Sequence, residues 1–347
     1  MAEEKFSESD LPTSIFAGDF SPDGEILITA SLGGTLAEWH ADTGERRRIL
    51  LDPKGIEDEN PQLFIVEEGK KVEAPFHLRR LSESQRGSSL LSVRFSPDGK
   101  YFGVGAANGE VVVWNAQSRG ELFNWSAHKT DVVALDISAD RKWLATGALE
   151  DGGTTFRVWR LQEYPFDVKE VISDCRHVCG VWAVCFSPDG RTVAAGGWTM
   201  SGYTAPQLYD VESGKHLDWL YWDMTRAMRF SPDGRHILTG DEFGSVKLWK
   251  IGEHEPVFEL KAHKDIACPV GFSPDGKRFY SACAGEGIKV WETETERLLG
   301  ESAIDGRILA CRFADEGRTL VAASAAQNAD HPNIHKLTGL PYRYAEG

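Results

Sequence analysis

Four residues near the middle of the chain carry side chains that bind transition metals: Cys175, His177, Cys179 and Cys185. Thiolate sulfur and imidazole nitrogen are the ligands that zinc prefers in structural sites. The first three alternate with single intervening residues, so their spacing is compatible with a zinc centre. Zinc binding is therefore the first chemistry that the chain offers.

The position of His177 along the chain favours a different role. Three histidines stand nine residues before a recurring five-residue sequence: His128 precedes Ile137, His177 precedes Phe186, and His263 precedes Phe272. A residue that recurs at one place in a repeat is more simply explained as part of the repeated structure. We therefore expect these histidines to be structural, and we predict no bound metal and no other cofactor.

A catalytic centre is not indicated either. Nucleophilic catalysis needs a serine, cysteine or threonine beside a base that a third group orients. The only histidines with a fixed place in the repeat are the three above, and His331 and His335 stand in an irregular last segment. The glycine pairs belong to turns and form no phosphate-binding loop. We therefore predict that the protein is not an enzyme.

The recurring sequence is clearest from Phe272 to Gly276, where it reads Phe-Ser-Pro-Asp-Gly. Proline favours the first corner of a type I turn, aspartate suits the second corner, and glycine takes the left-handed position that follows. The apolar residues on either side belong to two strands, so each copy predicts a β-hairpin. Further copies begin at Phe20, Phe95, Phe186 and Phe230, and degraded copies begin at Ile137 and Phe313.

The copies are regularly spaced after the first one. They recur about every 40–50 residues, a period typical of a unit of four short strands. The residues around the later strands alternate between apolar and polar, as in a half-buried strand. An aromatic residue follows each of the first six copies at a nearly constant distance: Trp39, Trp114, Trp159, Tyr209, Trp249 and Trp291.

This pattern resembles the WD-repeat family of β-propellers, and the resemblance covers nearly the whole chain. It implies a single all-β domain over residues 1–347, a seven-bladed β-propeller of four-stranded antiparallel blades. Blade one is expected at about 14–51 and blades two to seven at about 88–340. The resemblance also implies that a terminal strand is exchanged to close the ring, which removes exposed strand edges. The candidate is Lys5 to Ser7, pairing near Ile334 to Leu337; a frayed end is the alternative.

The first interval between copies is longer than the others, which leaves an insertion at about 52–85. It mixes clusters of acidic and basic residues, and Leu63 to Val66 is apolar enough to form a strand. Insertions of this size in a compact fold are usually functional or disordered. Two interpretations stay open: the insertion decorates the ring, or it forms part of a partner site.

In the resembling family, the recurring histidine bonds within its blade to a hydroxyl and an aspartate, and the tryptophan completes the set. Blade six lacks the acid because Gly285 occupies the aspartate position, and blade four has Ala195 and Tyr209 in place of the hydroxyl and the tryptophan. Blades without the histidine must be held by packing and strand pairing. The expected network residues are His128, Thr146, Asp151 and Trp159 in blade three, His177 in blade four, and His263, Ser281 and Trp291 in blade six.

Partner contacts in the resembling family concentrate on the rim where the blades enter the central channel. The corresponding positions here are unusually apolar for a solvated rim, and tryptophan and arginine dominate the binding energy of protein interfaces. The alternative is that several of the aromatic side chains only pack between blades. The predicted partner-binding residues are Phe16, Leu91, Val133, Trp182, Trp198, Met200, Trp222, Met224, Arg226, Glu242 and Arg307.

Composition restricts the partners further. The formal net charge is −15, so nucleic acid and anionic membranes are poor partners. No run approaches the about 20 apolar residues that span a membrane, and the first residues lack the apolar core of a signal peptide. Six cysteines in 347 residues make no disulfide framework and indicate a reducing, cytoplasmic setting. The oligomeric state stays open.

These observations predict a non-catalytic scaffold that binds a protein or peptide on the rim of blades four and five. One alternative is a structural subunit that joins a larger complex through its blade edges and the 52–85 insertion. A less favoured alternative is a propeller enzyme with a metal or polar centre in the channel. A shared fold does not separate these alternatives, because function depends on surface residues.

Overall fold

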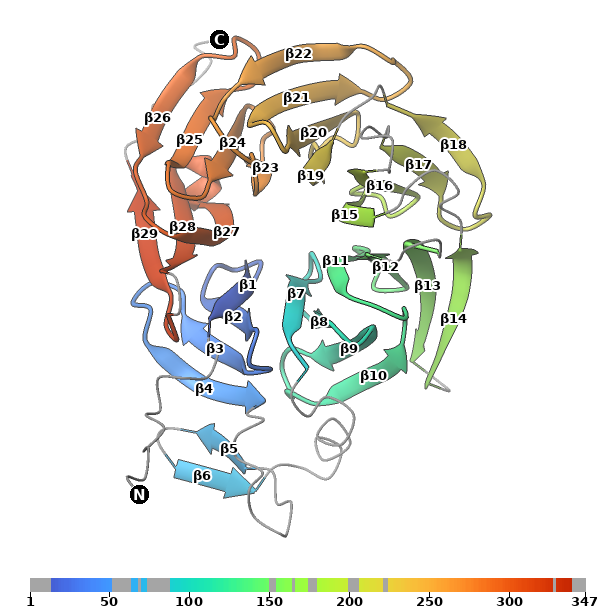
Figure 1. Cartoon of the computed structure of the whole chain (residues 1–347), viewed down its shortest axis with the longest axis vertical. Helices are drawn as coiled ribbons and strands as arrows, with labels where there is room; N and C mark the ends of the chain where they lie inside the picture. Colours follow the sequence, from blue (N-terminus) through green and yellow to red (C-terminus); the bar gives the residue numbers. More distant parts are fainter. Residues whose placement is uncertain are drawn as a thin grey trace, which may run out of the picture.

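The computed structural model describes residues 14–51, 64–67, 70–73, 88–149, 154–163, 166–173, 180–198, 206–220, 224–326 and 329–338. Strands dominate throughout this part of the chain, and its only helical element is the 3₁₀ turn η3 at Asp315–Gly317. Seven antiparallel sheets stand around a central channel in chain order (Figure 1). The predicted seven-bladed β-propeller is therefore confirmed.

The first strand of each sheet is innermost and faces the channel (Figure 1). These inner strands are β1 (Ile15–Phe20), β7 (Leu90–Phe95), β11 (Val132–Ile137), β15 (Gly180–Phe186), β19 (Thr225–Phe230), β23 (Val270–Phe272) and β27 (Arg307–Ala314). The second strands are β2 (Ile26–Ser31), β8 (Tyr101–Ala106), β12 (Trp143–Ala148), β16 (Thr192–Trp198), β20 (His236–Asp241), β24 (Arg278–Cys283) and β28 (Thr319–Ala325).

The outer strands complete the blades. The third strands are β3 (Leu36–His40), β9 (Glu110–Asn115), β13 (Phe156–Glu163), β17 (Gln207–Asp210), β21 (Ser245–Lys250), β25 (Gly287–Glu292) and β29 (Asn333–Leu337). The fourth strands are β4 (Arg46–Leu51), β10 (Glu121–Ser126), β14 (Phe166–Ser173), β18 (His216–Trp219), β22 (Pro256–Lys261) and β26 (Leu298–Ser302). Within the described residues the seventh blade therefore has three strands.

The turns between first and second strands follow the predicted chemistry. Gly276 adopts φ +70°, in the left-handed region where a side chain would be strained. The serine of the turn has a role that the turn type alone did not predict. Ser273 Oγ donates to Asp275 Oδ1 at 2.6 Å and accepts from the Arg278 backbone N–H at 3.0 Å, and Asp275 accepts from the Lys277 N–H. The same serine–aspartate bond recurs at 2.5–2.8 Å in the first five blades.

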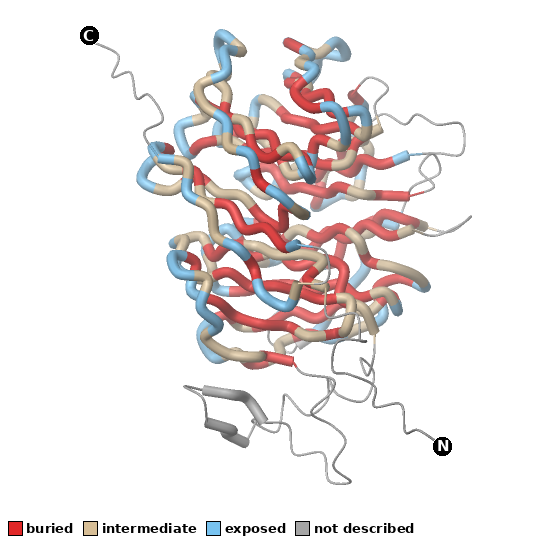
Figure 2. Tube along the Cα trace, turned by 60° about the vertical axis from the view of Figure 1, so that its left-hand side comes forward, coloured by how far each residue is buried: buried red, intermediate tan, exposed pale blue. Residues whose placement is uncertain are grey.

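Buried side chains join each blade to the next, and the buried residues follow the middle of the sheets (Figure 2). The last blade is joined to the first in the same way. Ile15 and Trp39 of blade one share one apolar cluster with Leu309 and Ala323 of blade seven. The Ile15 backbone N–H also donates to the carbonyl of Ala329 at 3.2 Å. The predicted closing strand, Lys5 to Ser7, lies outside the described residues.

The expected polar network is present in blade three. His128 Nε2 lies 2.7 Å from Thr146 Oγ1, and the Trp159 indole donates to the same oxygen at 3.0 Å. Both Thr146 and His128 are buried, so these bonds satisfy polar groups that water does not reach. Asp151, and His177 of blade four, lie outside the described residues.

Blade six corrects one detail of the sequence analysis. The prediction that this blade lacks the acid is wrong, because Glu286 supplies it: Glu286 Oε2 lies 3.2 Å from His263 Nδ1. The chain bends at Gly285, φ +77°, and this brings the next residue to the histidine. On its other side, His263 Nε2 lies 2.9 Å from Ser281 Oγ, which also accepts from the Trp291 indole at 3.0 Å.

Blades without the repeated histidine keep part of the network. Trp39 donates to Thr29 Oγ1 at 2.7 Å in blade one. Trp249 donates to Thr239 Oγ1 at 3.0 Å in blade five. Because the network was expected only in blades with the histidine, these tryptophan–threonine bonds were not predicted.

The insertion after blade one contains a two-stranded hairpin, β5 (Phe64–Glu67) and β6 (Lys70–Glu73). The strand expected at Leu63 to Val66 is present as β5, shifted by one residue. The hairpin lies outside the ring, beyond β4 (Figure 1). The rest of the insertion lies outside the described residues.

Candidate functional site

A cavity of about 410 Å³ occupies the central channel and is lined by all seven inner strands. Its wall consists mostly of short consecutive runs of these strands, such as the residues from Phe16 to Asp19 and from Arg226 to Arg229. Six predicted partner-binding residues lie in this wall, and we call these six residues the channel mouth: Phe16, Leu91, Val133, Trp182, Arg226 and Arg307.

The other predicted residues lie beside the cavity or outside the described part. Glu242 pairs with the channel mouth, because its Oε2 lies 3.0 Å from Arg226 Nη2. Met224 is half-buried just before β19, and Trp198 is 39% exposed at the end of β16. None of these three lines the cavity. Met200 and Trp222 lie outside the described residues.

Two arginines of the channel mouth stack on aromatic rings. The guanidinium carbon of Arg226 lies 4.1 Å from the centre of the Trp182 ring, which joins blades five and four. The guanidinium carbon of Arg307 lies 3.8 Å from the centre of the Phe16 ring, which joins blades seven and one. The strands that carry Arg307 and Trp182, β27 and β15, lie on opposite sides of the channel (Figure 1). Stacking keeps each guanidinium charge oriented without neutralising it.

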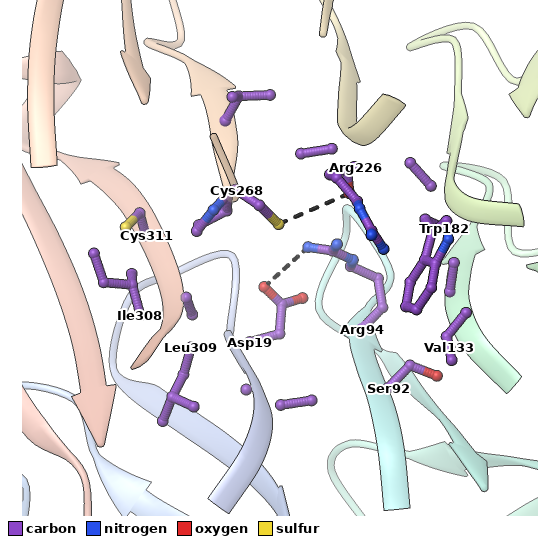
Figure 3. Close-up of a pocket in the computed structure, with 18 of the residues that line it drawn as sticks. Asp19, Ser92, Arg94, Val133, Trp182, Arg226, Cys268, Ile308, Leu309 and Cys311 are labelled. Atoms are coloured by element: carbon purple, nitrogen blue, oxygen red, sulfur yellow. Dashed lines mark hydrogen bonds and ion pairs between the residues drawn. The ribbon is translucent and has the colours of Figure 1, made fainter. Parts of the chain in front are cut away.

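The inner strands carry a second set of charged residues that was not predicted from the sequence. Asp19 Oδ1 lies 3.4 Å from Arg94 Nη1, and Asp19 Oδ2 accepts from the Phe95 backbone N–H at 2.8 Å (Figure 3). Asp136 accepts from the Phe186 backbone N–H at 2.8 Å in the same way. The available signal was the residue directly before each recurring sequence, which is charged in five of seven copies: Asp19, Arg94, Asp136, Arg229 and Arg312.

The channel shifts the titration of its groups. Burial raises the pKa of Asp136, while the nearby Arg229 and Arg94 act in the opposite direction. Partial removal from bulk water raises the pKa of Cys268, whose side chain is open to the channel, and burial raises the pKa of Cys311, so both thiols stay protonated at neutral pH. Thiols in this state are poor nucleophiles. Burial lowers the pKa of Arg307, which remains charged at neutral pH.

One group of described residues has the composition of a metal site. His263 Nδ1, Cys283 Sγ and a carboxylate oxygen of Glu286 lie within 4.8 Å of one another. Within this group, His263 already bonds to Glu286 and Ser281, and burial raises the pKa of the Cys283 thiol. These bonds favour the blade-six network over ion binding. The sequence candidates Cys175, His177 and Cys179 lie outside the described residues.

The described cavity wall contains no histidine, and its serine is already engaged. Ser92 Oγ donates to the carbonyl of Val132 at 2.9 Å, which holds blade two against blade three. The wall thus offers apolar surface, aromatic rings and arginines, which suit recognition of another molecule. In the part of the chain that the structure describes, no helix has the length and hydropathy to cross a membrane.

Comparison with known proteins agrees with the repeat pattern. A family model described as "WD domain, G-beta repeat" matches residues 78–115, 120–160, 170–201, 222–250 and 254–292. These matches cover more than half of the chain, and they correspond to blades two to six. Blades one and seven lie outside these matches and are recognised from the structure instead.

Three curated proteins illustrate the similarity. "Periodic tryptophan protein 2 homolog" from Dictyostelium discoideum is 25% identical over 65% of this chain. "Target of rapamycin complex subunit wat1" from Schizosaccharomyces pombe is 24% identical over 60% of this chain and 65% of its own length. "Target of rapamycin complex subunit LST8-1" from Arabidopsis thaliana is 24% identical over 79% of this chain and 78% of its own length. The chain spans about a quarter of the periodic tryptophan proteins, 24% and 25% of their lengths.

Proposed function

The chain belongs to the WD-repeat family of β-propellers, and from this premise we propose that it is a non-catalytic interaction scaffold. We place its binding site at the channel mouth, on the side of blades four and five. Its partner in this proposal is another protein or a peptide. Two relatives named as subunits of target of rapamycin complexes support a role in protein assembly.

The observation that carries the proposal is the stack of Arg226 on Trp182. The pair lies in the wall of an open cavity and joins two blades. The Trp182 indole nitrogen has no hydrogen-bond partner within the described residues. A partner that places a hydrogen-bond acceptor beside this N–H group would satisfy it, which favours binding.

The test is a pair of alanine substitutions, Trp182→Ala and Arg226→Ala, in one variant. Tryptophan and arginine in interface pockets contribute about 2 kcal/mol or more each, so we expect recovery of the partner to fall at least tenfold. The measurement is affinity purification from the native host followed by quantitative mass spectrometry. Circular dichroism and a thermal melt establish that the variant is folded.

A matched control removes the same residue types elsewhere. Trp219 is 54% exposed on the outer strand β18, and Arg235 is exposed beside the turn of blade five. The variant Trp219→Ala with Arg235→Ala should keep partner recovery. If the folded channel-mouth variant recovers as much partner as the wild-type protein does, the partner does not bind at the channel mouth.

A second candidate function is a structural subunit assembled through the insertion. The hairpin of β5 and β6 lies outside the ring, where it is available to another subunit (Figure 1). Replacing residues 52–85 by a short glycine-serine linker separates the two proposals. Loss of the complex after this deletion, with the channel-mouth variant unaffected, would favour the structural subunit.

A further inference from the structure

The cavity is basic although the chain is strongly acidic. Its wall contains four arginines and two aspartates, while the whole chain carries a net charge of −15. Cations in a narrow channel raise the electrostatic free energy of the protein unless anions pair with them. The arginines of the wall therefore favour the binding of an anionic group. The wall arginines are Arg94, Arg226, Arg229 and Arg307, and the wall aspartates are Asp19 and Asp265.

The four arginines differ in how far the protein neutralises them. Glu242 Oε2 forms an ion pair with Arg226 Nη2 at 3.0 Å. The nearby carboxylate of Asp136 favours the charged form of Arg229. Arg94 has only the long 3.4 Å contact with Asp19, and its buried Nε has no hydrogen-bond partner in the described chain. For Arg307, the described residues offer an aromatic ring but no carboxylate within ion-pair distance. The cavity therefore holds guanidinium groups with donors to spare.

Cys268 reports the field inside the cavity. Its side chain is exposed to the channel, and its Sγ lies 3.8 Å from the carbonyl of Arg226 (Figure 3). The charged groups that act most strongly on its thiol are Arg307, Arg229, Arg94 and Arg226, in that order. Removal from bulk water outweighs them and raises the pKa of the thiol, but all four are cations, so the nearby charges favour an anion over a cation at this position.

We propose that the channel receives an acidic side chain from the partner, with its carboxylate bound by Arg307 and Arg94. The inference rests on the proposed function and adds the chemistry of the occupant. Guanidinium groups bind carboxylates through strong, charge-assisted hydrogen bonds. Phe16 and Trp182 flank the entry and contact the apolar parts of the inserted segment.

The size of the cavity and the charge of the chain select this occupant. Pockets that hold small ligands enclose about 300–1,000 Å³, so 410 Å³ is room for a few side chains of an inserted segment. A nucleic acid would meet the acidic surface of a chain with net charge −15 along its whole length. A peptide that carries a single carboxylate avoids this repulsion and still satisfies the arginines.

The first test measures the field without knowing the partner. Two thiol reagents of equal size and opposite charge, sulfonatoethyl and trimethylammonioethyl methanethiosulfonate, compete for Cys268. Peptide mapping by mass spectrometry isolates modification at Cys268, and each rate is divided by the rate of the same reagent with a free thiol. We expect the anionic reagent to be favoured about tenfold at low ionic strength, and less so as salt screens the arginines.

Arg307→Gln should reduce this preference several-fold, while Arg235→Gln, on the turn of blade five, should leave it unchanged. Arg94→Gln with Asp19→Asn removes a cation together with its aspartate and leaves the net charge of the wall unchanged, so the preference should fall less than in Arg307→Gln. A preference for the cationic reagent, equal rates for both reagents, or a Cys268 that neither reagent reaches would overturn the inference.

The second test connects the field to peptide binding. A random 12-residue peptide library is passed over the immobilised protein, and the retained peptides are sequenced. We expect aspartate and glutamate to be enriched among them, with the enrichment lost in Arg307→Gln and kept in Arg235→Gln. Retained peptides without acidic enrichment would contradict the inference and leave the proposed function intact. If the wild-type protein retains no peptide, the inference fails, whereas the proposed function is judged by partner recovery with the channel-mouth variant.

Discussion

The hairpins formed by the first and second strands of the blades have two ends, and the residues at these ends differ in how closely they repeat. At the turn end, the same serine, aspartate and left-handed residue recur from blade to blade, and their polar groups bond to one another. At the channel mouth, six blades contribute one residue each, and these residues range from Val133 to Trp182 and Arg307. The turn end therefore stabilises the repeated structure of the blades, which we call the frame. The residues of the channel mouth instead vary from blade to blade. Residues that depart from the repeat are the ones that can select a partner.

The largest expected difference is in stability. Trp249 is buried between blades four and five, among Leu208, Leu220 and Ile237, and its indole donates to Thr239. Trp249→Ala opens a cavity in this packing and should lower the free energy of unfolding by about 3–5 kcal/mol. Trp182→Ala removes a ring that faces the channel and should cost less than half as much. Urea unfolding of both variants measures the difference, and equal losses would mean that the channel mouth is part of the frame.

The next effect concerns the hydroxyl at the centre of the blade-three network. Thr146→Val keeps the shape of the side chain but leaves the Trp159 indole and His128 without this partner. Leaving a buried polar group unsatisfied costs about 1–3 kcal/mol, so we expect a loss in that range. Thr43 is exposed, and Thr43→Val provides the control. A Thr146→Val variant as stable as the wild type would show that packing alone holds blade three.

The sequence predicted the frame well because the frame is repetitive. The turn glycines and the recurring aromatic residues followed from residues at constant spacing, and the partners of the recurring histidine were expected from the family resemblance. Glu286 was missed because it stands one residue away from the expected position, and a spacing rule does not detect a bend at Gly285. The ion pair of Asp19 with Arg94 was missed because its partners are far apart in the chain and meet only when neighbouring blades pack. Contact between a partner and the channel mouth stays a prediction.

A smaller effect tests whether the turn ends are equivalent. Gly24 and Gly276 adopt φ +78° and +70°, and a Cβ at either position would meet no backbone atom within 4 Å. The cost of an alanine there is therefore the left-handed backbone itself, about 1–2 kcal/mol. Gly24→Ala and Gly276→Ala should lower the free energy of unfolding by the same amount within error. A clear difference between the two variants would show that blades one and six do not share one turn.

The smallest effect is a difference in how stability depends on pH, because the pKa values of carboxylates in the two regions shift in opposite directions. The hydroxyl of Ser187 and a backbone N–H lower the pKa of Asp189 in its turn below the ordinary 3.8. Its stabilising effect is therefore complete above pH 3.8 and is lost as the pH falls through the lowered pKa. Burial raises the pKa of Asp136 in the channel above 3.8. Its ionisation therefore weakens the fold as the pH rises from 3.8 through the raised pKa.

Two asparagine substitutions separate these contributions. Asp189→Asn should reduce the fall of the melting temperature on the acid side of pH 3.8, since the group that gains a proton is gone. Asp136→Asn should instead raise the melting temperature relative to the wild type as the pH increases above 3.8. Thermal melts of the three proteins between about pH 2.5 and 6.5 measure both slopes. Because asparagine keeps an acceptor oxygen for the Phe186 backbone N–H, a destabilised Asp136→Asn variant at every pH would mean that Arg229 and Arg94 outweigh burial at this position.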